Sequence, residues 1–261
     1  MSRPLAVVTG ASGGIGAELA RCFAAGGHDL VLTARRADEL HTLAAELAGV
    51  TCHVLPLDLA DPMARGELVA GLAARGLTAD VLVANAGFGL YGPFADSDER
   101  RLLDLLQVNV TAVTHLVRLL LPGMVERKRG RILTVASVAA FQPGPLMAAY
   151  YASKAYVLSL SEALSYECRG TGVTVTCLCP GPTTTGFASA AVMGDSKLFD
   201  GPGVMDAKAV ADAGYRGCLQ GKRVVVPGVQ DRLGAFFGRH LPRRLILPLV
   251  ARVQARKEGR P

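Results

Sequence analysis

The chain has 261 residues, half of them hydrophobic and 19% charged, a composition that excludes a largely disordered protein and suffices for a full hydrophobic core. Its net charge of +6 is concentrated near the C-terminus, because residues 222–261 hold 10 Lys and Arg against 2 Asp and Glu, which leaves 18 against 20 in the rest of the chain. A slightly acidic body with 5% aromatic residues is not typical of a nucleic-acid-binding protein, so we predict no nucleic-acid partner.

The six cysteines contain no Cys-x-x-Cys pair, and the first residues lack the basic-then-apolar pattern of a secretory leader. Two charge-free runs, 132–153 and 170–194, are long enough to cross a bilayer, but both contain proline, glycine and several polar side chains. We therefore expect a cytoplasmic protein with reduced thiols and no transmembrane helix.

Short runs rich in β-branched residues alternate with helical patterns along most of the chain, which is typical of βαβ units on a parallel sheet. The predicted strands are Leu5–Thr9, Asp29–Ala34, Thr51–Leu55, Asp80–Ala84, Arg131–Ala136, Val173–Cys179 and Arg223–Val226. The predicted helices lie near residues 14–25, 37–48, 62–75, 98–121, 148–169 and 206–220.

Several of these strands are apolar almost throughout, so we expect helices to cover both faces of the sheet. The predicted fold is α/β: a single Rossmann-type domain over residues 1–227, with a doubly wound, parallel, seven-stranded sheet between two layers of helices. A basic, amphipathic, helical extension of the same domain is predicted over residues 228–261. The stretch Gly181–Met205 falls outside the alternation and follows a strand end, where ligand-contacting loops of open α/β sheets lie.

A glycine-rich turn, Thr9 to Gly16, connects the first predicted strand to the first predicted helix. Glycines in such a turn let backbone N–H groups approach a pyrophosphate at the helix N-terminus, which predicts a dinucleotide cradle. The spacing Gly10-x-x-x-Gly14-x-Gly16 differs from the commoner G-x-G-x-x-G, and a plain strand-to-helix turn is the alternative.

The second predicted strand is followed by Arg35 and Arg36, at the position where a carboxylate often binds the adenosine ribose. Arginine donates paired hydrogen bonds to a phosphate and can stack on adenine. These two residues therefore predict a preference for the phosphorylated cofactor, NADP(H). The alternative is that they are ordinary solvated charges at the start of a helix.

Tyr150 and Lys154 stand four residues apart in a predicted helix and therefore share one face. A nearby ammonium lowers the pKa of a phenol and makes it a usable acid or base near neutral pH. Tyr151, three residues before Lys154, fits the spacing as well.

Ser137 is expected at the carboxyl end of the fifth strand, where it could hydrogen-bond a carbonyl oxygen. A turn serine and a hydrolytic serine are the alternatives, although no G-x-S-x-G surrounds Ser137.

Taken together, these motifs resemble those of the short-chain dehydrogenase/reductase family. The matching residues, in the family's order and spacing, are Thr9-Gly10, Gly14, Gly16, Asn85-Ala86-Gly87, Asn109, Ser137, Tyr150, Lys154 and Pro180-Gly181. The resemblance extends over residues 5–227, and the family's spacing of 13 between serine and tyrosine selects Tyr150 over Tyr151.

The resemblance implies a catalytic tetrad. Tyr150 is expected to donate the proton in carbonyl reduction, and Lys154 to lower its pKa and hold the nicotinamide ribose. Ser137 is expected to steady the substrate oxygen, and Asn109 to fix a water in the proton relay. The resemblance also implies NADP(H), with cofactor contacts from Gly10, Ser12, Gly14, Ile15, Gly16, Arg35, Asp58, Leu59, Asn85, Ala86, Gly87, Tyr150, Lys154, Pro180, Gly181 and Thr185. No metal site is predicted.

The predicted reaction is the NADPH-dependent interconversion of a carbonyl and an alcohol by hydride transfer. The segments expected around the substrate are mostly apolar: 88–91, 138–141, 146–147, and a stretch with Phe187, Met193, Phe199 and one cation, Lys197. A lipophilic ketone or aldehyde, such as a 3-oxoacyl or steroid-like compound, is therefore favoured, with loop packing as the alternative role of these residues. The alternative function is an NADP-binding regulatory or scaffold protein without turnover, although a scaffold would not need the tetrad.

The C-terminal tail places apolar residues beside arginines at roughly helical spacing, from Phe236 to Arg252. Such a segment can lie peripherally on an anionic membrane surface. Packing on the body or on a partner subunit is the alternative. From the family resemblance we expect a homodimer or homotetramer, associated through the helices near 98–121 and 148–169.

Overall fold

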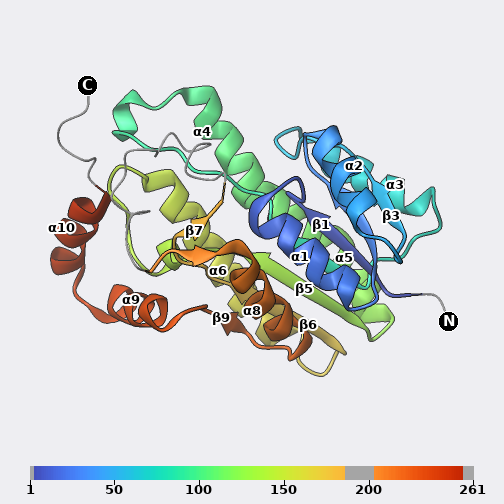
Figure 1. Cartoon of the computed structure of the whole chain (residues 1–261). Coiled ribbons are helices and arrows are strands. Elements are labelled where there is room, and N and C mark those ends of the chain that lie inside the picture. The colour runs from blue at the N-terminus through green and yellow to red at the C-terminus, as the bar shows by residue number, and fades with distance from the viewer. Residues whose placement is uncertain (1–2, 186–202, 255–261) are drawn as a thin grey trace.

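The computed structural model describes residues 3–185 and 203–254 (Figure 1). At its centre is a parallel sheet of seven strands in the order β3-β2-β1-β4-β5-β6-β9. These strands are β1 (Leu5–Thr9), β2 (Asp29–Thr33), β3 (Cys52–Val54), β4 (Val81–Ala84), β5 (Gly130–Val135), β6 (Val173–Leu178) and β9 (Val224–Val225). The chain begins in the middle of the sheet, winds outward to β3 and then returns to build the other half from β4, so the predicted doubly wound sheet is confirmed.

Six helices cover the two faces of the sheet (Figure 1). One layer consists of α1 (Gly14–Ala25), α2 (Ala37–Glu46) and α8 (Ala207–Leu219). The other consists of α3 (Ala64–Ala73), α5 (Val113–Glu126) and α6 (Ala148–Glu167). The predicted helices and strands are all present, and most of their ends differ from the prediction by one or two residues.

The burial of β1 shows why the polar chemistry is confined to the ends of the strands. All five of its residues are buried. Leu5 and Val7 pack into the core under α3, α5 and α6, whereas Ala6 and Val8 pack into the core under α1, α2 and α8. Because both faces of the central strands are covered, a ligand can approach them only at an edge, and the edge at their carboxyl ends holds the switch point between β1 and β4.

The predicted helix near 98–121 differs from the observed structure in two ways. It consists of α4 (Glu99–Leu106), a π-helical segment η2 (Gln107–Ala112) and α5, and it continues beyond Pro122 to Glu126. Proline removes the hydrogen bond to the carbonyl four residues earlier, that of Arg118. Arg118 is exposed, so water can satisfy this carbonyl and the helix continues through the proline.

The same helical stretch, Glu99–Glu126, is the one segment among the described residues that is long and apolar enough to span a membrane. Its most apolar window has a mean hydropathy of 1.4, and 39% of that window is buried in the protein. A helix that packs one face on a sheet meets this criterion of length and composition as well.

The remaining elements lie at the carboxyl edge of the sheet or in the tail. They are η1 (Phe94–Asp96), η3 (Val138–Phe141), the parallel pair β7 (Thr183–Thr184) and β8 (Met205–Asp206), and the tail helices α9 (Val229–His240) and α10 (Arg243–Gln254). Strands β7 and β8 lie at the two ends of the stretch Gly181–Met205, which was predicted to fall outside the alternation. Phe187, Met193, Lys197 and Phe199 of that stretch lie outside the described residues.

Candidate active site

A cavity of about 940 Å³ lies at the carboxyl edge of the sheet and continues beneath the tail helices. It is lined by all 16 residues predicted to bind the cofactor: Gly10, Ser12, Gly14, Ile15, Gly16, Arg35, Asp58, Leu59, Asn85, Ala86, Gly87, Tyr150, Lys154, Pro180, Gly181 and Thr185.

 These residues therefore line one cavity. The sequence placed these residues on six separate segments, and the fold brings them together.

The glycine-rich turn between β1 and α1 is shaped for close backbone approach. A Cβ at Gly16 would collide with the carbonyl oxygen of Gly10 and with the side chain of Asn85. Gly14 has a φ of 54°, a conformation that disfavours other residues, and a Cβ there would lie 3.1 Å from Thr185 Cγ2. Only a bare backbone fits these positions, and α1 begins at Gly14. The turn therefore has the geometry of an anion cradle at a helix N-terminus.

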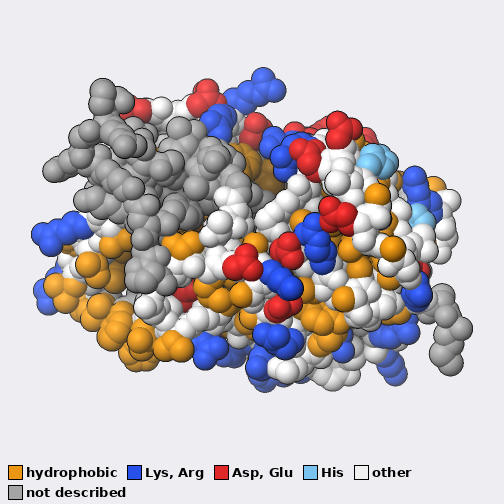
Figure 2. Space-filling view, in the orientation of Figure 1, with side chains coloured by type: hydrophobic (Ala, Val, Ile, Leu, Met, Phe, Trp, Pro, Cys, Tyr) orange, Lys and Arg blue, Asp and Glu red, His pale blue; other side chains and the backbone are white. Residues whose placement is uncertain are grey.

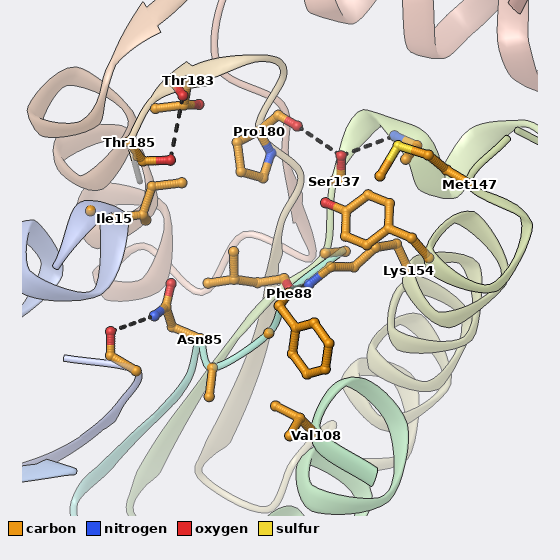
Figure 3. Close-up of a pocket in the computed structure, with 18 of the residues that line it drawn as sticks. Ile15, Asn85, Phe88, Val108, Ser137, Met147, Lys154, Pro180, Thr183 and Thr185 are labelled. Atoms are coloured by element: carbon orange, nitrogen blue, oxygen red, sulfur yellow. Dashed lines mark hydrogen bonds between the residues drawn. The ribbon is translucent and has the colours of Figure 1, made fainter. Parts of the chain in front are cut away.

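Asn85 holds this turn from the neighbouring strand end. Its Nδ2 donates to the carbonyl oxygens of Thr9 at 3.0 Å and Gly10 at 3.2 Å (Figure 3). The backbone N–H groups of Asn85 and Ala86 both donate to Thr9 Oγ1 at 3.0 Å. The side chain of Asn85 therefore fixes the turn, a positioning role in addition to its place in the cavity lining.

Both arginines after β2, Arg35 and Arg36, line the cavity, and Arg36 also contacts the glycine-rich turn. Arg36 Nη2 donates to the carbonyl oxygen of Ser12 at 3.1 Å and to its hydroxyl at 3.2 Å. Arg36 also pairs with Glu39 at 3.1 Å. Sequence reasoning selected Arg35 and left Arg36 out of the cofactor contacts, because neighbours in sequence give no indication of which one turns toward the glycine-rich loop.

Asp58 and Leu59 line the same end of the cavity, on the loop after β3. Asp58 Oδ1 accepts a hydrogen bond from the backbone of Ala60 at 3.0 Å, which stabilises the loop. The buried Arg65 donates to the carbonyl oxygen of Leu59 at 3.0 Å and to Gln107 at 3.3 Å. Arg65 was not singled out in the sequence, and it connects this loop to the π-helical segment η2.

Ser137 stands just beyond β5, at the start of η3 (Figure 3). Its hydroxyl donates to the carbonyl oxygen of Pro180 at 3.3 Å and accepts from the backbone of Ala139 at 3.1 Å. It also shares a hydrogen bond with Tyr150. The predicted serine and tyrosine therefore meet in the structure, and both line the cavity.

Lys154 is buried one helical turn after Tyr150 in α6. Its Nζ donates to the carbonyl oxygen of Val135 at 2.8 Å and lies 5.7 Å from the centroid of the Tyr150 ring. A Cβ at Gly87 would lie only 3.3 Å from this Nζ, so the glycine leaves room for the ammonium. Lys154 is thus held between the end of β5 and the loop after β4.

The pKa values of this pair differ from the sequence-based expectation. Burial raises the pKa of Tyr150 above its ordinary value, and the hydrogen bond with Ser137 opposes the rise. Burial also lowers the pKa of Lys154 to about 8. Desolvation of the phenol dominates, so the net shift in the pKa of Tyr150 is upward rather than the expected downward one, and a lowering effect of the Lys154 ammonium stays a prediction. The raised pKa keeps the proton on Tyr150, as a proton donor requires.

Asn109 lies in η2 and is buried. Its Oδ1 accepts from the backbone of Phe88 at 3.1 Å, and its Nδ2 donates to the Phe88 carbonyl at 3.0 Å and to Ser153 Oγ at 3.0 Å. Asn109 is not part of the cavity lining, unlike the other three members of the predicted tetrad. Its side chain positions the loop after β4, and its part in a water relay stays a prediction. π-helical segments are frequent at functional sites.

The loop after β6 closes the cavity between its two ends. Pro180, Gly181 and Thr185 all line it (Figure 3). Asp231 of α9 accepts a hydrogen bond from the backbone of Gly181, and a Cβ at Gly181 would collide with this carboxylate. Burial raises the pKa of Asp231, and the bond to Gly181 opposes the rise. The tail is thus fastened to the loop predicted to meet the nicotinamide.

The far end of the cavity is mostly apolar, and much of its wall comes from the tail. Phe88, Val138, Ala139 and Met147 line it as expected from the sequence. The tail helices add Gly234, Phe237, Ile246, Leu249, Val250, Val253 and Gln254. Arg101 and Asp104 of α4 are the charged residues at this end, and sequence reasoning did not include them.

Helix α10 is anchored directly beside the two tyrosines. Ile246 and Val250 are buried in one cluster with Leu105, Ala139, Met147, Tyr150 and Tyr151. Gln254 is buried, and its side-chain Nε2 donates to the hydroxyl of Tyr151. Its backbone carbonyl oxygen accepts a hydrogen bond from the hydroxyl of Tyr91 at 2.7 Å. The hydroxyl of Tyr151 is therefore occupied by the tail, whereas that of Tyr150 meets Ser137. The signal in the sequence for this contact was the helical spacing of apolar residues beside arginines in the tail, for which packing on the body was one of the alternatives.

The family model described as short chain dehydrogenase matches residues 4–194 of the chain. The very-long-chain 3-oxoacyl-CoA reductase of Phaeosphaeria nodorum is 36% identical over 180 residues, which are 66% of this chain and 53% of that protein. The chain therefore spans about half the length of this relative.

Two solved structures are similar over almost the whole chain. The short-chain dehydrogenase from Sphingobium yanoikuyae in complex with NADPH superposes with a TM-score of 0.81 at 32% identity, over 98% of this chain and 100% of its own. The bulky-bulky ketone specific alcohol dehydrogenase from Comamonas testosteroni superposes with a TM-score of 0.77 at 30% identity, over 94% of this chain and 90% of its own.

Because the ammonium of Lys154 is buried, we expect its removal by substitution to stabilise the folded protein by an amount that depends on pH. A pKa lowered from 10.5 to about 8 means that the folded protein at pH 7 carries a charge whose burial costs about 3 kcal/mol. Lys154→Met should therefore raise the free energy of unfolding at pH 7, by roughly 1–3 kcal/mol once the lost hydrogen bond is counted. Between pH 8 and 10.5 the unfolded chain binds a proton that the folded chain does not, so the wild type gains stability and the difference shrinks.

Denaturant unfolding without added nucleotide, at pH 7 and at pH 10, measures this difference. Lys208→Met, which removes an exposed lysine of α8, is the matched control and should show no such change with pH. A Lys154→Met protein that is less stable than the wild type at pH 7 would contradict the desolvation argument.

The anchoring of α10 predicts different effects for two neighbouring residues. Ile246→Ala opens a cavity under α10 and should cost about 2–4 kcal/mol in the free energy that holds this helix down. Amide hydrogen exchange of α10 should then accelerate relative to β5. Leu245→Ala, at a side chain that is 58% exposed, should leave exchange nearly unchanged. Equal acceleration in both variants would mean that α10 does not pack as described.

Proposed function

Because this chain belongs to the short-chain dehydrogenase/reductase family of oxidoreductases, we propose that it interconverts a lipophilic ketone or aldehyde and its alcohol with NADPH. The observation that carries the proposal is the convergence of Ser137, Tyr150 and Lys154 on one cavity, with a glycine-rich cradle at one end and an apolar wall at the other. A protein that only binds a dinucleotide would not need this convergence.

The residues at the cradle end fit a dinucleotide. The bare backbone of Gly14 and Gly16 at the start of α1 would receive the pyrophosphate, and Arg35 and Arg36 would bind a 2′-phosphate. Asp58 and Leu59 would hold the adenine side, and Pro180, Gly181 and Thr185 would hold the nicotinamide side. When bound, NADPH supplies the hydride for carbonyl reduction.

The protein's own contribution is the proton and the orientation of the carbonyl. Tyr150 gives its hydroxyl proton to the carbonyl oxygen, and the raised pKa keeps that proton in place until the oxygen becomes basic. Ser137 has one hydroxyl proton, which would turn from the carbonyl oxygen of Pro180 to the same substrate oxygen. Lys154 places a positive charge behind the phenol and favours its ionised form after the proton has left.

The apolar end of the cavity supports a lipophilic substrate. Its lining includes Met147, Phe237, Ile246 and Val250. Among the described residues, the charged groups at this end are Arg101 and Asp104, both in α4. The similarity to a 3-oxoacyl-CoA reductase and to a bulky-ketone alcohol dehydrogenase agrees with this class. A 3-oxoacyl or steroid-like carbonyl compound is the substrate that we propose.

Three expectations from the sequence stay predictions. These are a cytoplasmic location, the lack of a nucleic-acid partner, and homo-association through α4, α5 and α6. Exposed apolar side chains on these helices, such as Leu103, Leu119 and Tyr156, are compatible with such an association.

The proton-donor role distinguishes the two adjacent tyrosines. Tyr150→Phe keeps the ring and removes the acid, so kcat for reduction should fall by about 10²–10⁴-fold. Tyr151→Phe removes the hydroxyl that contacts Gln254 and should change kcat by less than about tenfold. The measurement is NADPH consumption with aldehydes, steroid ketones and 3-oxoacyl thioesters of increasing chain length.

The two tyrosine variants also test the alternatives. A loss in Tyr151→Phe with activity retained in Tyr150→Phe would assign the proton to Tyr151. Tight NADPH binding without turnover of any carbonyl compound, by the wild type, would favour a regulatory or scaffold protein.

The hydrogen bonds of Arg36 with Ser12 predict different losses of cofactor affinity for variants of the two arginines. Arg35→Ala should weaken NADPH binding by roughly tenfold or more and leave NADH binding nearly unchanged, because it removes a charge-assisted bond to the 2′-phosphate. Arg36→Ala should weaken both cofactors, because Arg36 also holds Ser12 in the glycine-rich turn. Fluorescence titration with each nucleotide measures this, and an unchanged NADPH to NADH ratio in both variants would show that the preference is wrong.

A further inference from the structure

The two tail helices carry apolar side chains on the side that faces away from the protein. These side chains are Val229, Leu233, Phe236 and Phe237 of α9 and Leu245, Leu249 and Val253 of α10, which are between 45% and 71% exposed. We call them the tail face. In Figure 2, hydrophobic side chains gather over α9 and α10 at the lower left.

Folding of the tail does not require this face. The inner sides of the helices are already buried through Ala235, Ile246, Val250 and Gln254. Leu245, Leu249 and Val253 follow at intervals of four, which places them in one stripe along the outside of α10. Val229, Leu233 and Phe236 form the corresponding stripe of α9. Such outward apolar stripes expose surface that would be favourable to bury elsewhere.

The charges around the tail face have one sign. Residues 229–254 contain five arginines and one acidic residue, Asp231, which is half-buried against Gly181. All five arginines are exposed, and none forms an ion pair within the part of the chain that the structure describes. By helical spacing, Arg232 and Arg239 flank the apolar stripe of α9, and Arg244 and Arg252 flank that of α10.

The tail face is also continuous with the mouth of the cavity. Phe237, Leu249 and Val253 belong to both, because they are about half-exposed and also line the cavity. Within the described part of the tail, the apolar outer surface of α9 and α10 therefore extends to the cavity lining.

From these observations we propose that the tail face rests on an anionic lipid bilayer, and that the carbonyl substrate enters the cavity from that surface. Apolar stripes flanked by arginines fit a membrane interface, where the rings and aliphatic groups enter the acyl boundary and the guanidinium groups meet phosphates. The helices have 12 residues each, too short to span a bilayer, so they lie on it. Entry of the substrate, but not the docking itself, rests on the proposed function.

A second copy of the chain fits this face less well. A two-fold contact would bring the same arginine-rich patches together, and their one carboxylate in 229–254 is already engaged with Gly181. Anionic lipid supplies the missing negative charge, and a copy of the tail does not.

Flotation of the full-length protein with vesicles tests the docking without reference to activity. Phosphatidylcholine vesicles with phosphatidylglycerol should bind the protein, and vesicles without it should bind at least about fivefold more weakly, as should both at raised ionic strength. Leu233→Gln/Phe236→Gln should reduce binding to anionic vesicles by tenfold or more. The matched control is Met63→Gln/Phe94→Gln, at side chains that are 68% and 63% exposed elsewhere, and it should bind like the wild type.

The charge requirement has its own pair of variants. Arg239→Gln/Arg244→Gln should weaken binding to anionic vesicles about fivefold or more, since each arginine near such a surface contributes a comparable factor before screening. Arg75→Gln/Lys128→Gln removes the same net charge from other exposed positions and should have little effect. All these substitutions are outside the cavity lining, and circular dichroism of each variant is the check that it is folded.

The proposal is overturned by a wild type that does not bind anionic vesicles, or by binding that the control pairs reduce as much as the tail variants. It is also overturned if sedimentation shows an oligomer that Leu233→Gln/Phe236→Gln dissociates, since the face would then join copies of the chain. Vesicle binding without turnover of any carbonyl compound would contradict the proposed function and leave the docking intact. Turnover of soluble ketones without vesicle binding would contradict the docking alone.

Discussion

The ammonium group of Lys154 is buried at the end of β5, where it donates a hydrogen bond to the carbonyl oxygen of Val135. A charge in this position is costly, and burial lowers its pKa to about 8. The neighbouring parts of the site are arranged around it: Gly87 leaves space, Asn109 fixes the loop that contains Gly87, and Tyr150 covers the ammonium with its ring. The burial of this charge lowers stability and places a positive charge beside Tyr150, the proposed proton donor.

Burial shifts the pKa values of Tyr150 and Lys154 in opposite directions. Desolvation keeps Tyr150 protonated and keeps Lys154 ready to lose its charge, so the pair is poised differently from a phenol and an ammonium in water. Ser137 is the group that opposes the rise in the pKa of Tyr150, through a hydrogen bond that also positions the phenol. The pKa of Tyr150 therefore depends on its burial and on its contact with Ser137, and not only on its spacing from Lys154 along the helix.

The tail is a wall of the site. Asp231 is bonded to the loop predicted to meet the nicotinamide, Arg243 donates to the carbonyl of Phe141 just after Ser137, and Gln254 contacts Tyr151. These contacts reach the loop after β6, the end of η3 and the first turn of α6. Movement of α9 and α10 would therefore change the shape of the cavity, and the outer side of the same helices presents the tail face to the surroundings.

The sequence by itself determined the parallel sheet, its two helical layers and the placement of the glycine-rich turn, Ser137, Tyr150 and Lys154 at one edge. Local patterns are enough for this, because strand burial and helical spacing are properties of neighbouring residues. Only the tertiary structure decided that Arg36 bonds Ser12, that burial controls the pKa of Tyr150, and that Gln254 meets Tyr151 across 103 residues. An amphipathic helix specifies which of its sides is apolar, but the surface that it covers depends on how the whole chain packs.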